Sequence, residues 1–86
     1  MKLENIPGAL DVLARIARGY GVTVADVLSP SRLRSVARAR SAFIGVLRHT
    51  LDLSYPEIGA LMGQHHSTVM HAVARHERRV ELELVT

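Results

Sequence analysis

The chain lacks cysteine and tryptophan, and its only aromatic residues are Tyr20, Phe43 and Tyr55. Without cysteine it can form neither disulfides nor thiolate metal sites. Its core must be largely aliphatic, which favours helices because strands prefer aromatic and β-branched side chains. No apolar run reaches the roughly 18 residues of a membrane span, and no signal-peptide pattern opens the chain. We therefore expect one cytoplasmic domain, residues 1–86.

Acidic residues are missing from one long stretch. Between Val27 and Leu51 there is no aspartate or glutamate, whereas five arginines fall there: Arg32, Arg34, Arg38, Arg40 and Arg48. A guanidinium group can grip phosphate with two hydrogen bonds, so a patch of one sign suits a polyanion. A solvated helix face explains the same cluster without any ligand. The charge pattern alone leaves both interpretations open.

The first half of the chain has the apolar spacing of helices. A first helix is expected with Pro7 in its first turn and Gly21 at its end. Its apolar stripe is Ile6, Leu10, Leu13 and Ala17, with Ile16 beside it. Thr23 and Asp26 are spaced as a capping pair for a short helix that ends at Leu28.

A break and a basic connector separate this short helix from a longer one. Ser29-Pro30-Ser31 is the break, and the connector Arg32–Ser35 follows it. The long helix is expected from about Val36 to Leu51. Its apolar stripe is Val36, Ala39, Phe43, Leu47 and Leu51, and its arginines lie mostly off this stripe.

A helix-turn-helix pattern occupies about residues 54–79. Ser54 and Glu57 are spaced as a capping box, and Gly63 suits the left-handed end of a short helix. That helix is expected to turn Ile58, Leu61 and Met62 inward. A second helix should begin near Ser67, with Val69, Val73 and Val80 as its buried stripe. The tail, residues 80–86, alternates like a strand but could equally continue the helix.

Several motifs resemble one protein family. The segments are Val24–Leu28, Arg34–Arg38, Tyr55-Pro56-Glu57-Ile58-Gly59 and Gly63-Gln64-His65-His66-Ser67-Thr68-Val69-Met70-His71-Ala72. They resemble the C-terminal, duplex-DNA-binding domain (domain IV) of the bacterial chromosomal replication initiator DnaA, in the same order and over about residues 8–78. The resemblance implies an all-α, Trp-repressor-like helix-turn-helix domain.

The resemblance also implies roles for individual residues. It assigns Arg32, in a basic segment with Arg34, to the minor groove, and Arg40 and Arg48 to phosphates. Backbone amides around Tyr55 and Pro56 would hold a further phosphate, which is sensible at a helix start. The base-reading group would be Gln64, His65, His66, Ser67, Thr68 and His71, with Arg75 on the same side of the second helix.

Two departures from the family pattern bear on the target. The family has Arg-Asp where this chain has Gln64-His65, and its turn is one residue longer. A carboxylate accepts a hydrogen bond from cytosine, whereas a neutral histidine can donate or accept, so the family's target sequence does not transfer. The chain also has no phosphate-binding loop of the ATPase type.

The clustered histidines allow other chemistry in principle. A zinc site wants ligands on one helix face, but His66 and His71 are about 500° apart around a helix. Hydrolysis needs an acid to orient the base, and no acid is spaced to orient His71 beside Ser67. His66 could instead simply cap the second helix. DNA contact explains the whole set best.

We expect sequence-specific binding of double-stranded DNA, through the major groove and the adjacent minor groove. The sequence predicts a nucleoid-associated regulator of replication or transcription, with no enzymatic activity, cofactor, metal, membrane or small-molecule substrate. A different class stays open: a helical adaptor that keeps the fold and binds a protein, or a second copy of itself, through residues 80–86.

Overall fold

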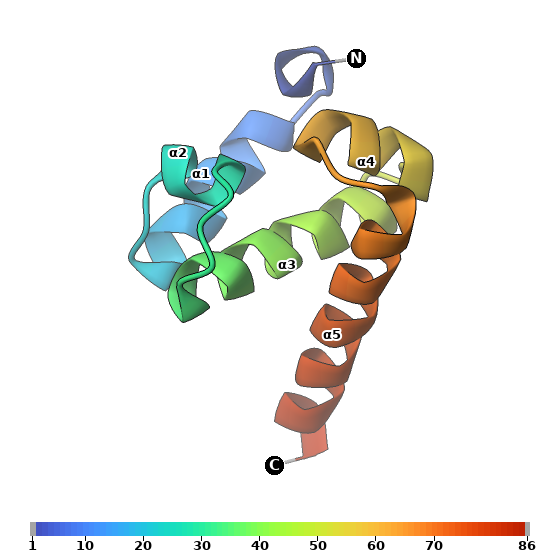
Figure 1. Ribbon diagram of the computed structural model, residues 1–86. Coiled ribbons are helices and arrows are strands. Elements are labelled where there is room, and N and C mark those ends of the chain that lie inside the picture. Colours follow the sequence, from blue (N-terminus) through green and yellow to red (C-terminus); the bar gives the residue numbers. More distant parts are fainter. Residues whose placement is uncertain (1, 86) are drawn as a thin grey trace.

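The computed structural model describes residues 2–85, and the side chain of residue 85 is not included in that description. A 3-10 turn, η1 (Leu3–Asn5), precedes five helices. The helices are α1 (Ala9–Tyr20), α2 (Val24–Leu28), α3 (Arg34–His49), α4 (Tyr55–Met62) and α5 (His66–Val85). Residues 2–85 contain no strand, which confirms the all-α prediction (Figure 1). None of the described helices is both long and apolar enough to cross a membrane.

Helix α3 is the centre of the domain, and the other four helices all pack against it. Its side chains Phe43, Ile44 and Leu47 are fully buried. The surrounding helices contribute further fully buried side chains to the same cluster: Leu13, Val27, Ile58 and Val69. The radius of gyration is 12.0 Å, which matches the roughly 12 Å expected for a compact domain of this length. An aliphatic core with one central phenylalanine is thus enough to form a compact domain.

The first helix differs from its prediction at the start. Gly8 has a φ of 82°, so the backbone turns left-handed there and α1 begins only at Ala9. Leu13 and Ala17 of the predicted stripe are buried, but in the first turn Ala9 is fully buried in place of Leu10, which is 49% exposed. The prediction that Leu10 faces the core was therefore wrong, while the predicted end at Gly21 is confirmed by its left-handed cap.

The two predicted capping boxes are present. Thr23 and Asp26 exchange side-chain and backbone hydrogen bonds at the start of α2, and Ser54 and Glu57 do the same at α4. These hydrogen bonds lower the pKa of both carboxyls, because the backbone amides of Thr23 and Ser54 stabilise the ionised forms. Each helix therefore starts at a position fixed by its own sequence.

Helix α3 begins earlier and ends earlier than predicted. It starts at Arg34, so the loop between α2 and α3 is residues 29–33, called the basic loop from here on. It ends at His49, and the amides of Thr50 and Leu51 both donate to the carbonyl of Val46. Leu51 therefore lies outside the helix but still packs against the core.

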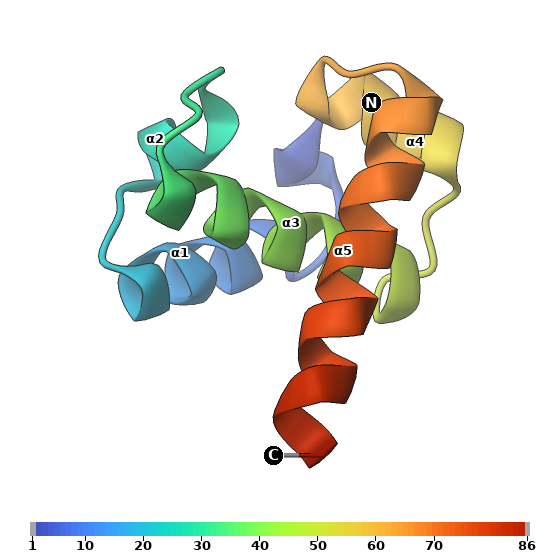
Figure 2. The same cartoon turned by 60° about the horizontal axis from the view of Figure 1, so that its bottom comes forward.

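Helices α4 and α5 form the predicted helix-turn-helix, with Gly63 in the left-handed conformation between them (Figure 2). The turn is tight at Gly59, where a Cβ atom would lie 2.5 Å from the carbonyl oxygen of Gln64. Helix α5 starts at His66 and continues as helix to Val85, which decides the conformation of the tail up to that residue. Thr86 lies outside the described residues.

One buried position predicted for α5 was wrong. Val69 and Val73 are buried as expected, but Val80 is 40% exposed. Helix α5 crosses α3 near Gly45, where its His76 is in close contact, and then projects past the rest of the domain (Figure 2). Beyond this crossing α5 has little left to pack against, so residues with helical apolar spacing face solvent.

Candidate nucleic-acid interface

The first three turns of α5 present a polar face to solvent. Its members are the exposed side chains Ser67, Thr68, His71 and Arg75, called the reading face from here on. The opposite side of the same turns holds Val69 and Val73 in the core. This division follows from helical periodicity, since residues three or four apart share a face. The structure therefore brings together the residues that the sequence placed on one side of this helix.

His65 caps the start of α5. Its carbonyl accepts from the amides of Thr68 and Val69 at 3.0 and 3.2 Å. Its Nδ1 atom accepts from the amide of Ser67 at 3.2 Å, and the Ser67 hydroxyl lies 2.7 Å from the same nitrogen. The alternative interpretation gave the capping role to His66, but the structure gives it to His65. His66 is exposed, with its ring 4.1 Å from that of His65.

The cap fixes the hydrogen-bonding character of His65. A nitrogen that accepts from a backbone amide carries no proton, so in the neutral ring the proton is on Nε2. The ring is exposed. His65 thus presents an N–H donor to the surroundings at the position where the resembled family has a carboxylate acceptor.

Gln64 lies in the turn but not on the outer surface. It is half-buried, and its Oε1 atom is buried without a hydrogen-bond partner. It lines a pocket of about 180 Å³ together with Arg40, Thr68 and Arg75. Among the predicted base-reading residues, Gln64 is therefore the one least available to a ligand that approaches the reading face.

Arg40 ties the basic loop to the body of the domain. Its Nε donates to the carbonyl of Val27 at 2.9 Å, and its Nη1 donates to that of Ser31 at 3.0 Å. Its Nη2 donates to the carbonyls of Asp26 and Ser29. Burial lowers the pKa of this guanidinium. The resemblance implied a phosphate contact here, but four backbone carbonyls already take most of its donors.

The basic loop and the start of α5 lie on the same side of α3 (Figure 2). The loop and the α4–α5 turn line a shared pocket of about 270 Å³, in which Ser29 and Pro30 lie opposite Gly63 and Gln64. Arg32 and Arg34 are exposed at the end of this loop. A single surface therefore contains the basic loop and the reading face.

Arginines from three segments line a further pocket of about 390 Å³ on this surface, called the arginine pocket. It is lined by Arg32, Arg34, Ala37, Arg38, Ser41, Arg75 and Arg79. Arg38 and Arg79 were not among the predicted site residues. The sequence carried a signal for both, because Arg38 belongs to the stretch without acids and Arg79 follows Arg75 by one helical turn.

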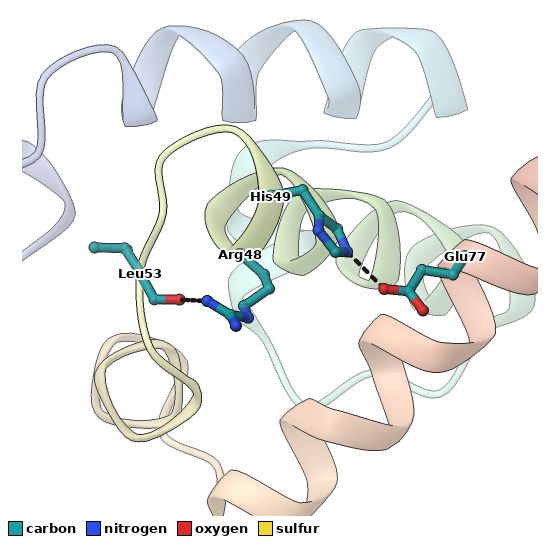
Figure 3. A network of polar contacts seen from close by, with 4 residues as sticks. All are labelled: Arg48, His49, Leu53 and Glu77. Carbon is teal, nitrogen blue, oxygen red and sulfur yellow. Dashed lines mark hydrogen bonds and ion pairs between the residues drawn. The ribbon is translucent and has the colours of Figure 1, made fainter.

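Arg48 and Tyr55 come together where α3 ends and α4 begins. The guanidinium carbon of Arg48 is 4.8 Å from the centroid of the Tyr55 ring. Figure 3 shows the second contact of Arg48, whose Nη1 donates to the carbonyl of Leu53 at 3.2 Å. The capping box uses the amides of Ser54 and Glu57, and Pro56 has none to offer. Of the amides implied for phosphate binding, that of Tyr55 remains.

A polar contact and a close packing contact join α5 to α3 on the side of His49. The Nε2 atom of His49 lies 2.7 Å from Oε1 of Glu77 (Figure 3). One residue earlier on α5, His76 lies against Gly45. Burial lowers the pKa of His76, and the charge of Arg79 lowers it further. No three histidine or acidic residues within the described part of the chain are grouped so that they could hold a metal ion.

Comparisons with known proteins agree with this geometry. The family described as "Bacterial dnaA protein helix-turn-helix" matches residues 10–75. The chain is similar to the chromosomal replication initiator protein DnaA of Deinococcus radiodurans, with 40% identity over 65 residues. It is also similar to the DnaA proteins of Picosynechococcus sp. (39% over 72 residues) and Nitrosomonas eutropha (40% over 68 residues).

These matches cover 76%, 81% and 78% of this chain but 14%, 16% and 14% of the relatives. The chain thus spans about one seventh of the length of the curated relatives that it matches. The matched region runs from α1 to the reading face, and it includes the basic loop, α4 and the first half of α5. The chain belongs to the family of bacterial DnaA helix-turn-helix domains.

Proposed function

We propose that this domain binds double-stranded DNA in a sequence-specific manner, with the start of α5 in the major groove. The observation that carries the proposal is the reading face, whose polar side chains are all exposed while Val69 and Val73 anchor the other side. Side chains at the start of a recognition helix are those that contact base edges. The relatives' printed name, chromosomal replication initiator protein, supports a DNA target.

The basic loop would enter the adjacent minor groove. Arg32 is exposed and lies on the same surface as the reading face, and arginine is a side chain that the negative potential of a narrow minor groove attracts. Arg48, held against Tyr55, would contact a phosphate at the start of α4. The proposal thus divides base contacts, which specify, from phosphate contacts, which position the domain.

The target should be of the DnaA-box type but altered at one base pair. Where the family's carboxylate can accept from a cytosine amino group, His65 offers the Nε2 proton. A donor suits an acceptor on the base edge, such as O6 or N7 of guanine. We infer that His65 changes the preferred base at its position rather than abolishing the contact.

The biological role would be occupation of such sites in the cytoplasm, on the nucleoid, in control of replication or transcription. The matched region is a helix-turn-helix, and binding through it requires no catalytic residue, cofactor or ATPase activity.

Fluorescence anisotropy with short duplexes tests the proposal. Affinity for a duplex with a DnaA-type box should exceed that for a scrambled duplex. It should fall with salt by about 0.9 log units per log unit of salt for each neutralised phosphate. Absence of binding to any duplex at low salt would contradict the proposal. Unbiased selection of bound duplexes would then define the site and its symmetry.

Substitutions separate the two kinds of contact. Thr68→Ala and His71→Ala should reduce the preference for the specific duplex by about 1–3 kcal/mol for each base edge that the side chain recognises. Arg48→Ala should weaken specific and scrambled duplexes alike. If the three variants behave identically, the division between base and phosphate contacts is wrong.

One observation favours a second candidate function, that of a protein-binding adaptor. The end of α5 carries exposed apolar side chains, with Val80 at 40% and Leu84 at 83% exposure. Sedimentation of the chain with and without residues 80–86 tests this role. An unchanged sedimentation coefficient after deletion, together with retained DNA binding, would exclude a dimer formed through this end.

A further inference from the structure

We propose that the arginine pocket binds a phosphate of the DNA backbone at the strand that separates the major groove from the adjacent minor groove. The inference rests on the proposed function and adds a contact to it. Its central residues are Arg38 on α3 and Arg79 on α5, and Arg79 lies beyond the residues 10–75 that match the family.

The pocket collects positive charge and has no acidic side chain in its own lining. Its five arginines are Arg32, Arg34, Arg38, Arg75 and Arg79. Within residues 2–85 none of them forms an ion pair, and no acidic side chain lines the pocket. Glu83 lines an adjoining pocket together with Arg78, and Arg38, Arg75 and Arg79 line both pockets. Like charges held this close repel one another, so an anion in the pocket would relieve the repulsion.

One guanidinium nitrogen of an arginine that lines the pocket has an unmet hydrogen-bonding capacity. Nη1 of Arg79 is buried and has no hydrogen-bond partner among the described residues. A buried donor without an acceptor is costly, and more so when it is charged. A phosphate offers several charged acceptor oxygens and can accept two parallel hydrogen bonds from one arginine. The unpartnered N–H donor of Arg79 and the positive charge of the pocket therefore both favour a phosphate ligand.

The position of the pocket identifies the phosphate. The arginine pocket shares Ala37, Ser41 and Arg75 with the pocket of about 180 Å³ described above, which is also lined by Gln64 and Thr68. A continuous groove between α3 and α5 thus leads from the reading face to Arg32 in the basic loop. A sugar–phosphate strand always separates a major groove from the adjacent minor groove. With the reading face in one groove and Arg32 in the other, that strand crosses the groove between α3 and α5.

Matched substitutions test the pocket. Arg38→Gln and Arg79→Gln should each weaken binding to specific and scrambled duplexes about tenfold at low salt, as expected when one charged hydrogen bond is removed. The slope of log affinity against log salt should become shallower by about 0.9 for each phosphate that is no longer neutralised. Arg79→Lys should retain most of the slope, because it keeps the charge but not the planar fork.

The control is Arg18→Gln, an exposed arginine on α1 that lines neither pocket. Its affinity and salt slope should equal those of the unmodified chain. Thermal unfolding by circular dichroism verifies that each variant is folded. If Arg38→Gln and Arg79→Gln bind DNA as the Arg18→Gln control does, the pocket makes no backbone contact and the proposal is wrong.

Duplexes with single methylphosphonate substitutions then locate the contact. Neutralising the phosphate between the two grooves should weaken binding by the unmodified chain more than binding by Arg79→Gln, which has already lost one of the contacts to that phosphate. Equal reductions in both proteins would overturn the proposal. Failure of the unmodified chain to bind any duplex would instead contradict the proposed function itself.

Calorimetry with inorganic tripolyphosphate distinguishes DNA phosphate from a soluble one. Tripolyphosphate binding that depends on Arg79, combined with unchanged DNA affinity of Arg79→Gln, would mean that the pocket serves a free phosphate ligand. That result would overturn the assignment to the DNA backbone. Reduced DNA affinity in Arg79→Gln, with competition by tripolyphosphate, would support it.

Discussion

Gly45 of α3 and His76 of α5 are in contact where the two helices cross. A Cβ atom at Gly45 would lie 2.3 Å from Cδ2 of His76, a separation that no two non-bonded carbon atoms adopt in a packed interior. Only glycine therefore permits this approach. The crossing sets the direction in which α5 leaves the core, and with it the orientation of the reading face.

Gly45→Ala should consequently destabilise the domain. Forcing His76 outward should lower the free energy of unfolding by about 1–3 kcal/mol, the usual cost of overpacking, and should weaken DNA binding. Urea denaturation and anisotropy measure the two effects. The control is Gly19→Ala in α1, where a Cβ atom meets nothing within 4 Å. That change should raise stability by about 0.5–1 kcal/mol. Equal effects at both glycines would mean that the crossing is not tight.

Arg40 should be essential for its geometry more than for its charge. Arg40→Lys keeps the charge, but one ammonium cannot reach the carbonyls of Val27, Ser29 and Ser31 together. We expect the free energy of unfolding to fall by about 1–3 kcal/mol, because partly buried carbonyls are left without donors. Amide hydrogen exchange in the basic loop should also accelerate. A lysine variant with unchanged stability and exchange would show that Arg40 acts only through its charge.

His65→Asp should switch the base preference without loss of the helix cap. Aspartate is a good capping residue and can accept from the Ser67 amide as Nδ1 of His65 does. It replaces an outward donor by an acceptor, so the preference at one base pair should change by about 1–3 kcal/mol. Selection of bound duplexes from a random pool measures this change. Identical selected sites for both proteins would mean that His65 makes no base contact.

Acid should destabilise the domain through His76. Burial holds the pKa of this histidine below its ordinary value of 6.5, with Arg79 and His49 adding to the effect and Glu77 and Glu83 opposing it. The unfolded chain therefore binds a proton near pH 6.5 that the folded chain resists. Stability from this source is complete above that pH and is lost as the pH falls below it.

The urea midpoint between pH 7.5 and 5 tests this expectation. It should fall in the unmodified chain and change less in His76→Gln, which cannot titrate. The carboxyls of Asp26 and Glu57 do not interfere, because their lowered pKa values affect stability only as the pH falls toward and below about 4.5. Parallel pH profiles for the two proteins would contradict a role for His76.

The sequence predicts local features of this fold well because their causes are local. Both capping boxes and the left-handed glycines at 21 and 63 depend on residues three or four positions apart. The exposure of Val80 was mispredicted for a different reason. Helical spacing shows that residues share a face, but it does not show how far along the helix a neighbour covers that face.

The candidate site shows the same limit. Exposed Thr68 and His71 could be placed from spacing alone, since the buried Val69 and Val73 fix the opposite face of the helix. The clamp made by Arg40 could not, because its acceptors are backbone carbonyls 9 to 14 residues earlier in the chain. Arginine that binds a carbonyl and arginine that binds phosphate look alike in sequence. Only the fold distinguishes them.

The hydrogen bonds of Arg40 also bear on how fast DNA is captured. Ordering a flexible loop costs about 1–2 kcal/mol per residue in backbone entropy. Here Arg40 already holds the loop of residues 29–33 through its hydrogen bonds to the carbonyls of Ser29 and Ser31. The backbone entropy of the loop is therefore lost during folding and not during association with DNA. In the proposed complex the basic loop would therefore engage its groove on first encounter, and loosening it should slow association as well as weaken the complex.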